Sequence, residues 1–137
     1  MSAAARSLSR LFTPCYAARI NSQIVHPATS VIVKPNELKS ALARPLHVAQ
    51  YEPERPPEYY AAQISYGIIM GHPFMDGNKR TAFFLANEYL RAQGRPGLTE
   101  VLQEADALRL LAQRYIQVAK GEMDVEALAF GLRKHLS

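Results

Sequence analysis

The sequence predicts an all-α domain, a bundle of about six helices. Apolar residues recur at the three- and four-residue spacing of helices along most of the chain. Proline and glycine residues interrupt this pattern at intervals that match the ends of single helices. A β-branched run at 31–33 is only three residues long and has no partner strand in the sequence. We therefore expect that run to form a loop packed on the core.

Length and composition exclude several classes of protein. The chain has 137 residues, of which 48% are hydrophobic and 20% are charged, as in a single globular domain. No apolar run approaches the roughly 20 residues that a membrane-spanning helix needs, so no membrane partner is expected. The single cysteine, Cys15, excludes an internal disulfide framework, and with four scattered histidines it argues against structural zinc.

The net charge of +4 comes from the N-terminal end. Glu37 is the first acidic residue, and four basic residues precede it. The remaining 101 residues carry 12 basic and 12 acidic side chains, so the sequence predicts no nucleic-acid-binding surface. Residues 1–10 are rich in Ser, Ala and Arg, which favours a disordered basic tail before a domain at 11–137. A disordered tail predicts a cytoplasmic protein. The same composition is also typical of a short targeting segment, which makes the mitochondrion the alternative compartment.

The first two helices are predicted from local signals. Thr13 and Pro14 resemble an N-cap and a first helical residue, and a helix over about 14–25 follows. A second, short helix begins after the cap residue Asn36 and ends near Arg44, because Pro45 follows. The proline-rich stretch from there to Pro57 is expected to be a loop.

The third and fourth helices are predicted at the centre of the bundle. The third spans about 57–71, and the fourth begins near Gly77 and ends just before Gly94, its C′ residue. Both contain runs that are apolar on all sides, such as Ala82 to Ala86. A fifth helix is predicted over 99–119, with a buried stripe through Val101, Ala105, Leu108, Ala112, Tyr115 and Ala119. A sixth begins after the cap residue Asp124, with Leu128, Leu132 and Leu136 on its buried face.

The turn between the third and fourth helices carries the candidate functional residues. A helix that starts at Gly77 offers free N–H groups and the positive end of its dipole to an anion. Lys79 and Arg80 in its first turn are unfavourable there unless an anion binds between them. Asp76 is a carboxylate of the kind that Mg²⁺ takes beside phosphate, and His72 can accept a proton from a hydroxyl. Together they predict phosphoryl or nucleotidyl transfer.

Taken one at a time, these residues have ordinary explanations. A histidine before a proline is commonly a loop residue, and lysines on helices are commonly solvated. Ten contiguous residues with complementary roles favour the functional interpretation. A P-loop does not explain them, because Gly71 and Gly77 are one residue too far apart and Asn78 follows.

The segment His72-Pro-Phe-Met-Asp-Gly-Asn-Lys-Arg80 resembles the signature of the Fic/Doc (Fido) family. Its Lys-Arg ending and the following Thr81 are similar to the Doc, or death-on-curing, branch. Residues 40–45, 61–71 and 121–124 resemble further Doc segments, and the likeness covers about residues 11–136. The resemblance implies a Fido-type bundle in which the motif turn lies at the N-terminus of a central buried helix.

The resemblance also implies roles. His72 would be the catalytic base, Asp76 the metal position, and the nucleotide would be bound by Gly77, Asn78, Lys79 and Arg80. The cofactors would be ATP and Mg²⁺, and the loop 46–56 would be the flap that aligns the target. Typical Fic proteins transfer AMP to a protein hydroxyl, whereas the Doc toxin transfers the γ-phosphate to a translation factor and is restrained by a small antitoxin.

Two departures favour the Doc-like activity. Lys79 stands where the AMP-transferring motif has Gly, and Phe83 stands where it has a second Arg. The first change adds bulk and charge, and the second removes a bidentate phosphate clamp. The sequence also has no Ser/Thr-x-x-x-Glu pattern of self-inhibited Fic proteins, so any inhibitor would be a small protein acting in trans. A Fic-type AMP transferase and a non-catalytic binding module remain the alternatives.

Overall fold

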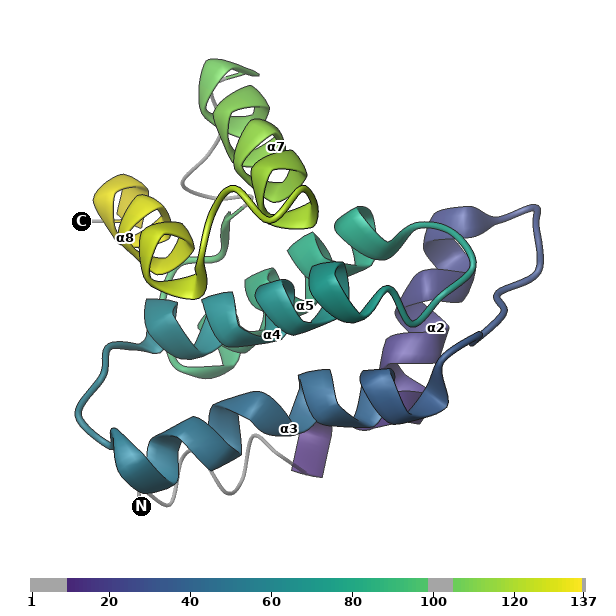
Figure 1. The fold of residues 1–137 in the computed structure, drawn as a ribbon, viewed down its shortest axis with the longest axis horizontal. Helices are drawn as coiled ribbons and strands as arrows, with labels where there is room; N and C mark the ends of the chain where they lie inside the picture. Colours follow the sequence, from purple (N-terminus) through teal and green to yellow (C-terminus); the bar gives the residue numbers. More distant parts are fainter. Residues whose placement is uncertain (1–9, 99–104, 137) are drawn as a thin grey trace.

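The computed structural model describes residues 10–98 and 105–136, and within these ranges the all-α prediction is confirmed. Six helices of 12 to 17 residues account for most of the described chain: α2 (Pro14–Val25), α3 (Pro35–Tyr51), α4 (Pro57–Gly71), α5 (Asn78–Ala92), α7 (Ala105–Ala119) and α8 (Val125–Leu136) (Figure 1). Among the described helices, none is long and apolar enough to cross a membrane.

Helix α4 lies at the centre of the bundle. It packs against α3, α5, α7 and α8, and eleven of its fifteen residues are buried. Gly67 permits the close approach of α3, because a Cβ atom there would lie 2.8 Å from the Cβ of Ala41. The prediction of a helix buried on nearly all sides is confirmed for α4, and its C-terminal end places the motif turn.

Helix α5 is less completely buried than its sequence predicts. Ala82, Leu85 and Ala86 are buried, but Phe84 is 43% exposed and lines a pocket with Ile20 and Ile24 of α2. The reason is that α2 covers only part of this side of α5, so the apolar run extends beyond the surface that α2 and α4 bury.

Helix α2 begins and ends where the sequence predicts. The hydroxyl of Thr13 accepts a hydrogen bond from the N–H of Tyr16 at 3.2 Å, and His26 follows the last helical residue. Residues 17, 21 and 25 form its buried face, whereas Ile20 and Ile24 are only partly buried. The buried position 21 is an asparagine, which matters for the site below.

The prediction of a short second helix is wrong. Helix α3 begins at Pro35 rather than after Asn36, and it continues through Pro45 to Tyr51. Proline within a helix removes one hydrogen bond and costs roughly 3 kcal/mol. Pro45 and Ala49 are buried, so packing of the second half of α3 against α4 offsets that cost. The loop that remains is 52–56.

The last two helices match their predictions in part. In α7 the buried face runs through Leu111, Tyr115 and Val118, while Ala112 and Ala119 are exposed. The predicted stripe is therefore rotated on the helix, because the larger Leu and Val side chains gain more from burial than alanine does. Val101 and the predicted helix start at 99 lie outside the described residues. The Asp124 cap of α8 is confirmed by a 2.9 Å bond from the Ala127 N–H to its Oδ1, and Leu128 and Leu132 are buried.

Candidate active site

The motif turn ends in the N-terminus of α5, which has the geometry of an anion site. Gly77 is the N-cap residue, with φ 76°, and its carbonyl accepts the first helical bond from the Thr81 N–H at 2.8 Å. The N–H groups of residues 78–80 precede that bond and lack helical acceptors. Gly77 is required here, because a Cβ atom would strain the backbone and lie 2.9 Å from Cγ1 of Val25.

Asn78 closes the turn with its side chain. Its Oδ1 accepts from the Phe74 N–H at 3.0 Å, and its Nδ2 donates to the Phe74 carbonyl at 2.8 Å. Phe74 is fully buried, so its side chain holds the loop against the core. Because the amide of Asn78 is occupied in this way, what Asn78 offers to an anion is its backbone N–H.

His72 is presented at the start of the turn by an unusual backbone conformation. It follows the last residue of α4 with φ 49° and ψ 54°, the left-handed region, and its side chain is exposed. Nδ2 of Asn78 lies 3.2 Å from its Nδ1. The two bonds to Phe74 fix which end of the Asn78 amide is NH₂, so Nδ1 of His72 is the acceptor. In the neutral imidazole the proton is therefore on Nε2.

Asp76 and Arg80 lie at the solvent side of the turn. Oδ1 of Asp76 accepts from the Gly77 N–H at 2.8 Å, and its Oδ2 lies 4.0 Å from Nη2 of Arg80. Nη1 of Arg80 donates to the Ile24 carbonyl at 3.3 Å, which holds this guanidinium toward the end of α2. The Asp76 side chain is 74% exposed, so one carboxylate is accessible beside the helix N-terminus.

The residues present fit a Mg²⁺ ion that is bound together with phosphate. Within the described chain, no group of three His, Cys, Asp or Glu side chains could hold a metal ion by itself. Mg²⁺ commonly takes one or two carboxylates, substrate phosphates and several waters. Asp76 supplies one such carboxylate, next to N–H groups that favour phosphate.

One pocket brings all six predicted site residues together. It has a volume of about 340 Å³ and is lined by His72, Met75, Asp76, Gly77, Asn78, Lys79 and Arg80. The contiguous motif therefore forms a single concave surface rather than a set of scattered loop residues.

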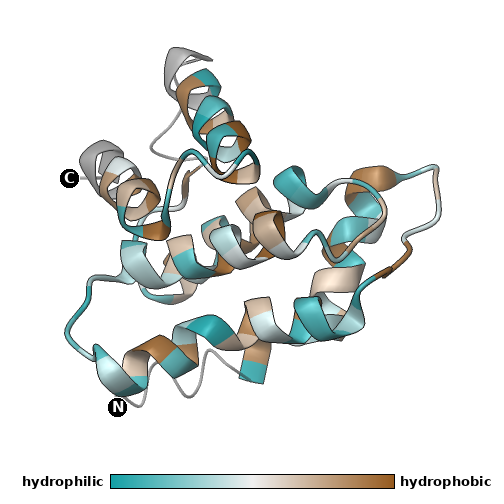
Figure 2. Ribbon diagram, in the orientation of Figure 1, coloured by the Kyte–Doolittle hydropathy of each residue, from teal (hydrophilic) through white to brown (hydrophobic). Residues whose placement is uncertain are grey.

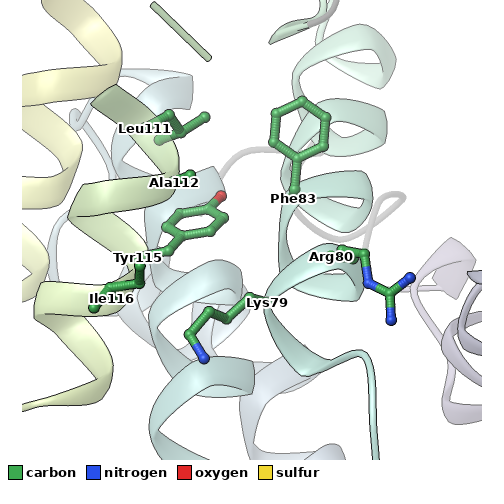
Figure 3. A pocket seen from close by; sticks show the side chains of 7 residues that line it. All are labelled: Lys79, Arg80, Phe83, Leu111, Ala112, Tyr115 and Ile116. Carbon is green, nitrogen blue, oxygen red and sulfur yellow. The ribbon is translucent and has the colours of Figure 1, made fainter. Parts of the chain in front are cut away.

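A second pocket adjoins the first and is mostly apolar. It has a volume of about 310 Å³, lies between α5 and α7, and is lined by Lys79, Arg80, Phe83, Leu111, Ala112, Tyr115 and Ile116. Figure 3 shows Phe83 facing the α7 side chains across the pocket, while the guanidinium of Arg80 points away from them. Burial raises the pKa of the Tyr115 phenol, whose hydroxyl is hydrogen-bonded to that of Ser65 at 2.9 Å.

The loop 46–56 is not beside the motif, so its assignment as the flap is wrong. Residues 46–51 belong to α3, and Arg55 in the remaining loop pairs with Glu126 at the start of α8. Figure 1 shows this loop at the opposite end of α4 from the motif turn. The error follows from reading Pro45 as a helix end.

The segment that lies beside the motif is 31–33, which sequence reasoning placed in an ordinary loop. Val33 donates its N–H to the Pro73 carbonyl at 2.7 Å, and Met75 donates to the Val31 carbonyl at 2.9 Å. Ile32 and Phe74 thus form an antiparallel bridge. In Figure 2 this stretch before α3 is coloured as hydrophobic, although its three side chains are 37–44% exposed. The β-branched run was the signal for this pairing.

Comparison with protein families agrees with this geometry. A model of the Fic/DOC family matches residues 10–90, which is more than half of the chain and includes α2, the bridge segment and the whole motif turn. The chain belongs to the Fic/DOC family. Members of this family are typically transferases that act on proteins. A comparison with curated proteins found no match.

Proposed function

We propose that this Fic/DOC protein is a Doc-like kinase that transfers the γ-phosphate of ATP to a hydroxyl group of a target protein. The observation that carries the proposal is Phe83. It stands where the AMP-transferring motif has a second Arg, and it lines the apolar pocket next to the phosphate site.

The two adjoining pockets support a nucleotide bound with its γ-phosphate at the motif. The N-terminus of α5 and Lys79 favour a phosphate group in the motif pocket. Phe83 and Tyr115 line the other pocket, which can bury the adenine ring of a nucleotide. Position 83 supplies no guanidinium group there to bind a triphosphate. The adenine ring then lies toward α7, and the γ-phosphate faces His72.

In the proposed reaction His72 takes the proton of the target hydroxyl. The hydroxyl oxygen forms a bond to the γ-phosphorus, the bond between that phosphorus and the β–γ bridging oxygen breaks, and ADP leaves. The proton goes to Nδ1 of His72, since Nε2 already carries one. The 3.2 Å contact between Nδ1 and Asn78 is at the long end of the normal hydrogen-bond range, so in this proposal the arriving hydroxyl replaces it.

Asp76, Lys79 and Arg80 bind the charged groups in this proposal. Asp76 would hold Mg²⁺, which when bound neutralises charge on the phosphate oxygens. Lys79 and the N–H groups of residues 78–80 hold the transferred phosphate. Arg80 reaches phosphate by leaving the Ile24 carbonyl, a single 3.3 Å bond at an exposed position.

The bridge segment 31–33 takes the role of the flap. Its backbone pairs with the motif turn, and its exposed apolar side chains offer a surface to an extended target segment. If the activity is restrained, we propose a small protein acting in trans as the inhibitor, since residues 1–137 contain no Ser/Thr-x-x-x-Glu pattern.

The second candidate is an AMP transferase of the Fic type. His72, Asp76, Gly77, Asn78 and Arg80 are common to both activities, and an anion site of this kind accepts an α-phosphate as readily as a γ-phosphate. A binding module without catalysis is disfavoured by the retained His72 and Asp76.

Incubation with ATP labelled at either the α- or the γ-phosphate, together with a panel of candidate proteins, tests the proposal. Label transferred from the γ position alone supports a kinase. Label transferred from the α position alone overturns that assignment in favour of AMP transfer. Calorimetric titration with Mg²⁺ and ATP is the parallel measurement, and absence of binding supports the non-catalytic module.

A further inference from the structure

A buried asparagine outside the motif connects the turn to two other elements. Asn21 of α2 is 1% exposed. Its Nδ2 donates to the Asp76 carbonyl at 2.9 Å and to Oγ1 of Thr81 at 3.1 Å. Its Oδ1 accepts from the hydroxyl of Ser30 at 2.6 Å. Both protons of the NH₂ group and the carbonyl oxygen are therefore used.

The orientation of this amide is fixed by its partners. The Asp76 carbonyl is an acceptor only, so the atom that faces it must be the NH₂ group. Its three partners lie in three different elements: the motif turn, helix α5 and the segment before α3. None is a neighbour of Asn21 in sequence, since the separations are 55, 60 and 9 residues.

We infer that Asn21 is a positioning residue for the candidate active site. By binding the Asp76 carbonyl it holds the peptide that joins Asp76 to Gly77, and this peptide sets where the Asp76 carboxylate lies relative to the first N–H groups of α5. The inference deepens the proposed function and rests on it for the identity of the ligand, Mg²⁺ with ATP.

Packing around Gly77 strengthens the same constraint. A Cβ atom on Gly77 would lie 3.2 Å from Nδ2 of Asn21 and 2.9 Å from Val25, so α2 is in close contact with the first residue of the site. The contact with Ser30 extends the link to the segment that pairs with Pro73 and Met75. One amide thereby holds the proposed flap and the proposed phosphate site in a fixed relation.

The test compares Asn21→Leu with Gln63→Leu. Each change replaces a buried amide by the same apolar side chain; Leu has as many non-hydrogen side-chain atoms as Asn and one fewer than Gln. Gln63 lies in α4 and accepts from Nε of Arg44 at 3.0 Å, in the interface with α3 and away from the motif. The two variants are compared at equal distances below their unfolding temperatures. Any difference between them then reflects the site and not a general loss of stability. Thr81→Val, which removes one partner of Asn21, is the second variant in case Asn21→Leu does not fold.

Two measurements are made on each variant. Hydrogen exchange follows the Phe74 and Met75 amides, which are bonded to Asn78 and Val31. We expect exchange about tenfold faster in Asn21→Leu than in Gln63→Leu, as loss of a buried hydrogen bond predicts. Calorimetry with ATP, with and without Mg²⁺, should show about tenfold weaker binding of the Mg²⁺ complex in Asn21→Leu alone. Thr81→Val should give a smaller change in the same direction.

Equal exchange and equal binding in the Asn21 and Gln63 variants overturn the inference. If the unaltered protein binds no ATP, the proposed function fails, but the exchange experiment still decides whether Asn21 holds the turn. Faster exchange without weaker nucleotide binding reduces Asn21 to a structural residue and also overturns its positioning role.

Discussion

Nδ2 of Asn78 lies 3.2 Å from Nδ1 of His72, and this contact determines which imidazole nitrogen can accept a proton. The same Asn78 amide is bonded at both ends to the main chain of Phe74. Loop closure and histidine orientation therefore depend on one side chain. The proposed base acts through Nδ1, the nitrogen that faces into the turn.

Replacement of His72 tests the proposed base. We expect His72→Ala to lower the rate of transfer by about 10²–10⁴, the usual contribution of a general base, while ATP binding is retained. Because His72 has φ 49°, alanine adds backbone strain, so His72→Asn is the matched variant that tolerates the left-handed region. Transfer rates and calorimetric ATP affinity are compared for both. Turnover at the unaltered rate in either variant contradicts the mechanism.

Asp76→Asn should raise the Mg²⁺ concentration needed for half-maximal transfer by about tenfold or more. The amide oxygen can still accept from the Gly77 N–H, so the loop is kept while the negative charge is lost. Asp124→Asn is the matched control, because Asp124 also accepts from a backbone N–H at a helix N-terminus but lies outside the motif. An unchanged Mg²⁺ requirement in Asp76→Asn would remove this residue from the metal position.

Lys79→Gly should weaken γ-phosphate transfer by roughly 10–100-fold, the range for a lost hydrogen bond to a charged group. Lys79 lines both the motif pocket and the apolar pocket, so its loss changes the phosphate site directly. We also expect some AMP transfer to emerge, more so when Phe83→Arg is added. Lys79→Ala separates loss of charge from the added flexibility of glycine. Unchanged γ-phosphate transfer in both variants would show that Lys79 does not contribute to the reaction, and it would weaken the kinase assignment.

Local signals in the sequence predict the starts of three helices correctly. The Thr13 cap, the start of α4 at Pro57 and the Asp124 cap depend on residues within one helical turn, so no tertiary information is needed. The motif pocket was predictable for the same reason, because its six site residues are nearly contiguous and one turn brings them together.

What the sequence could not predict depends on distant partners. Helix α3 continues through Pro45 because α4 packs against it, which overrides the local preference of proline. The run 31–33 pairs with a turn about forty residues away, so its β-branched pattern alone could not identify its partner. Asn21 gave no signal at all, since a single asparagine on a helix is ordinary until its bonds to Asp76 and Thr81 are seen.

We expect the stability of the protein to fall at high pH, because Tyr89 and Tyr115 are buried. Burial raises the pKa of Tyr89 to about 12 and also raises the pKa of Tyr115. Below pH 10 both are neutral in the folded and unfolded chains. Above pH 10 the unfolded phenols ionise while the folded ones do not, so the free energy of unfolding falls by about 1.4 kcal/mol per pH unit for each such tyrosine.

Urea unfolding between pH 9 and pH 11.5 measures this decline. Above pH 10, Tyr115→Phe should make the free energy of unfolding fall less steeply with pH, by about 1.4 kcal/mol per pH unit. This change in slope is separate from any loss of stability at pH 7 caused by the lost hydrogen bond to Ser65. Tyr51→Phe is the control, since Tyr51 is 84% exposed. Equal slopes for the Tyr115→Phe and unaltered proteins would show that the Tyr115 phenol ionises as readily in the folded chain.

Two N-terminal truncations test where the domain begins. Removal of residues 1–10 should leave a cooperatively folded domain, whereas removal of residues 1–25 should unfold it. Phe12 is buried and packs against Tyr16 and Tyr89, with both ring-centroid distances 5.6 Å, and the shorter truncation keeps it. The longer one removes all of α2 together with Asn21.

The energies explain why the two truncations should differ. Burial of one large apolar side chain contributes roughly 1.5–3 kcal/mol, and a domain of this size is stable by about 5–15 kcal/mol. The longer truncation removes Phe12, Ala17 and Val25 from the core and leaves the Asp76 carbonyl and the Thr81 hydroxyl without their buried donor.

Thermal unfolding of the two truncated proteins measures the difference in stability. Imaging of C-terminal fluorescent fusions with and without residues 1–10 tests that segment as a targeting signal. A 26–137 fragment that melts cooperatively near the full-length temperature would show that α2 is dispensable. In that case a presequence as long as 25 residues becomes compatible with the fold, and the mitochondrion becomes the favoured compartment over the cytoplasm.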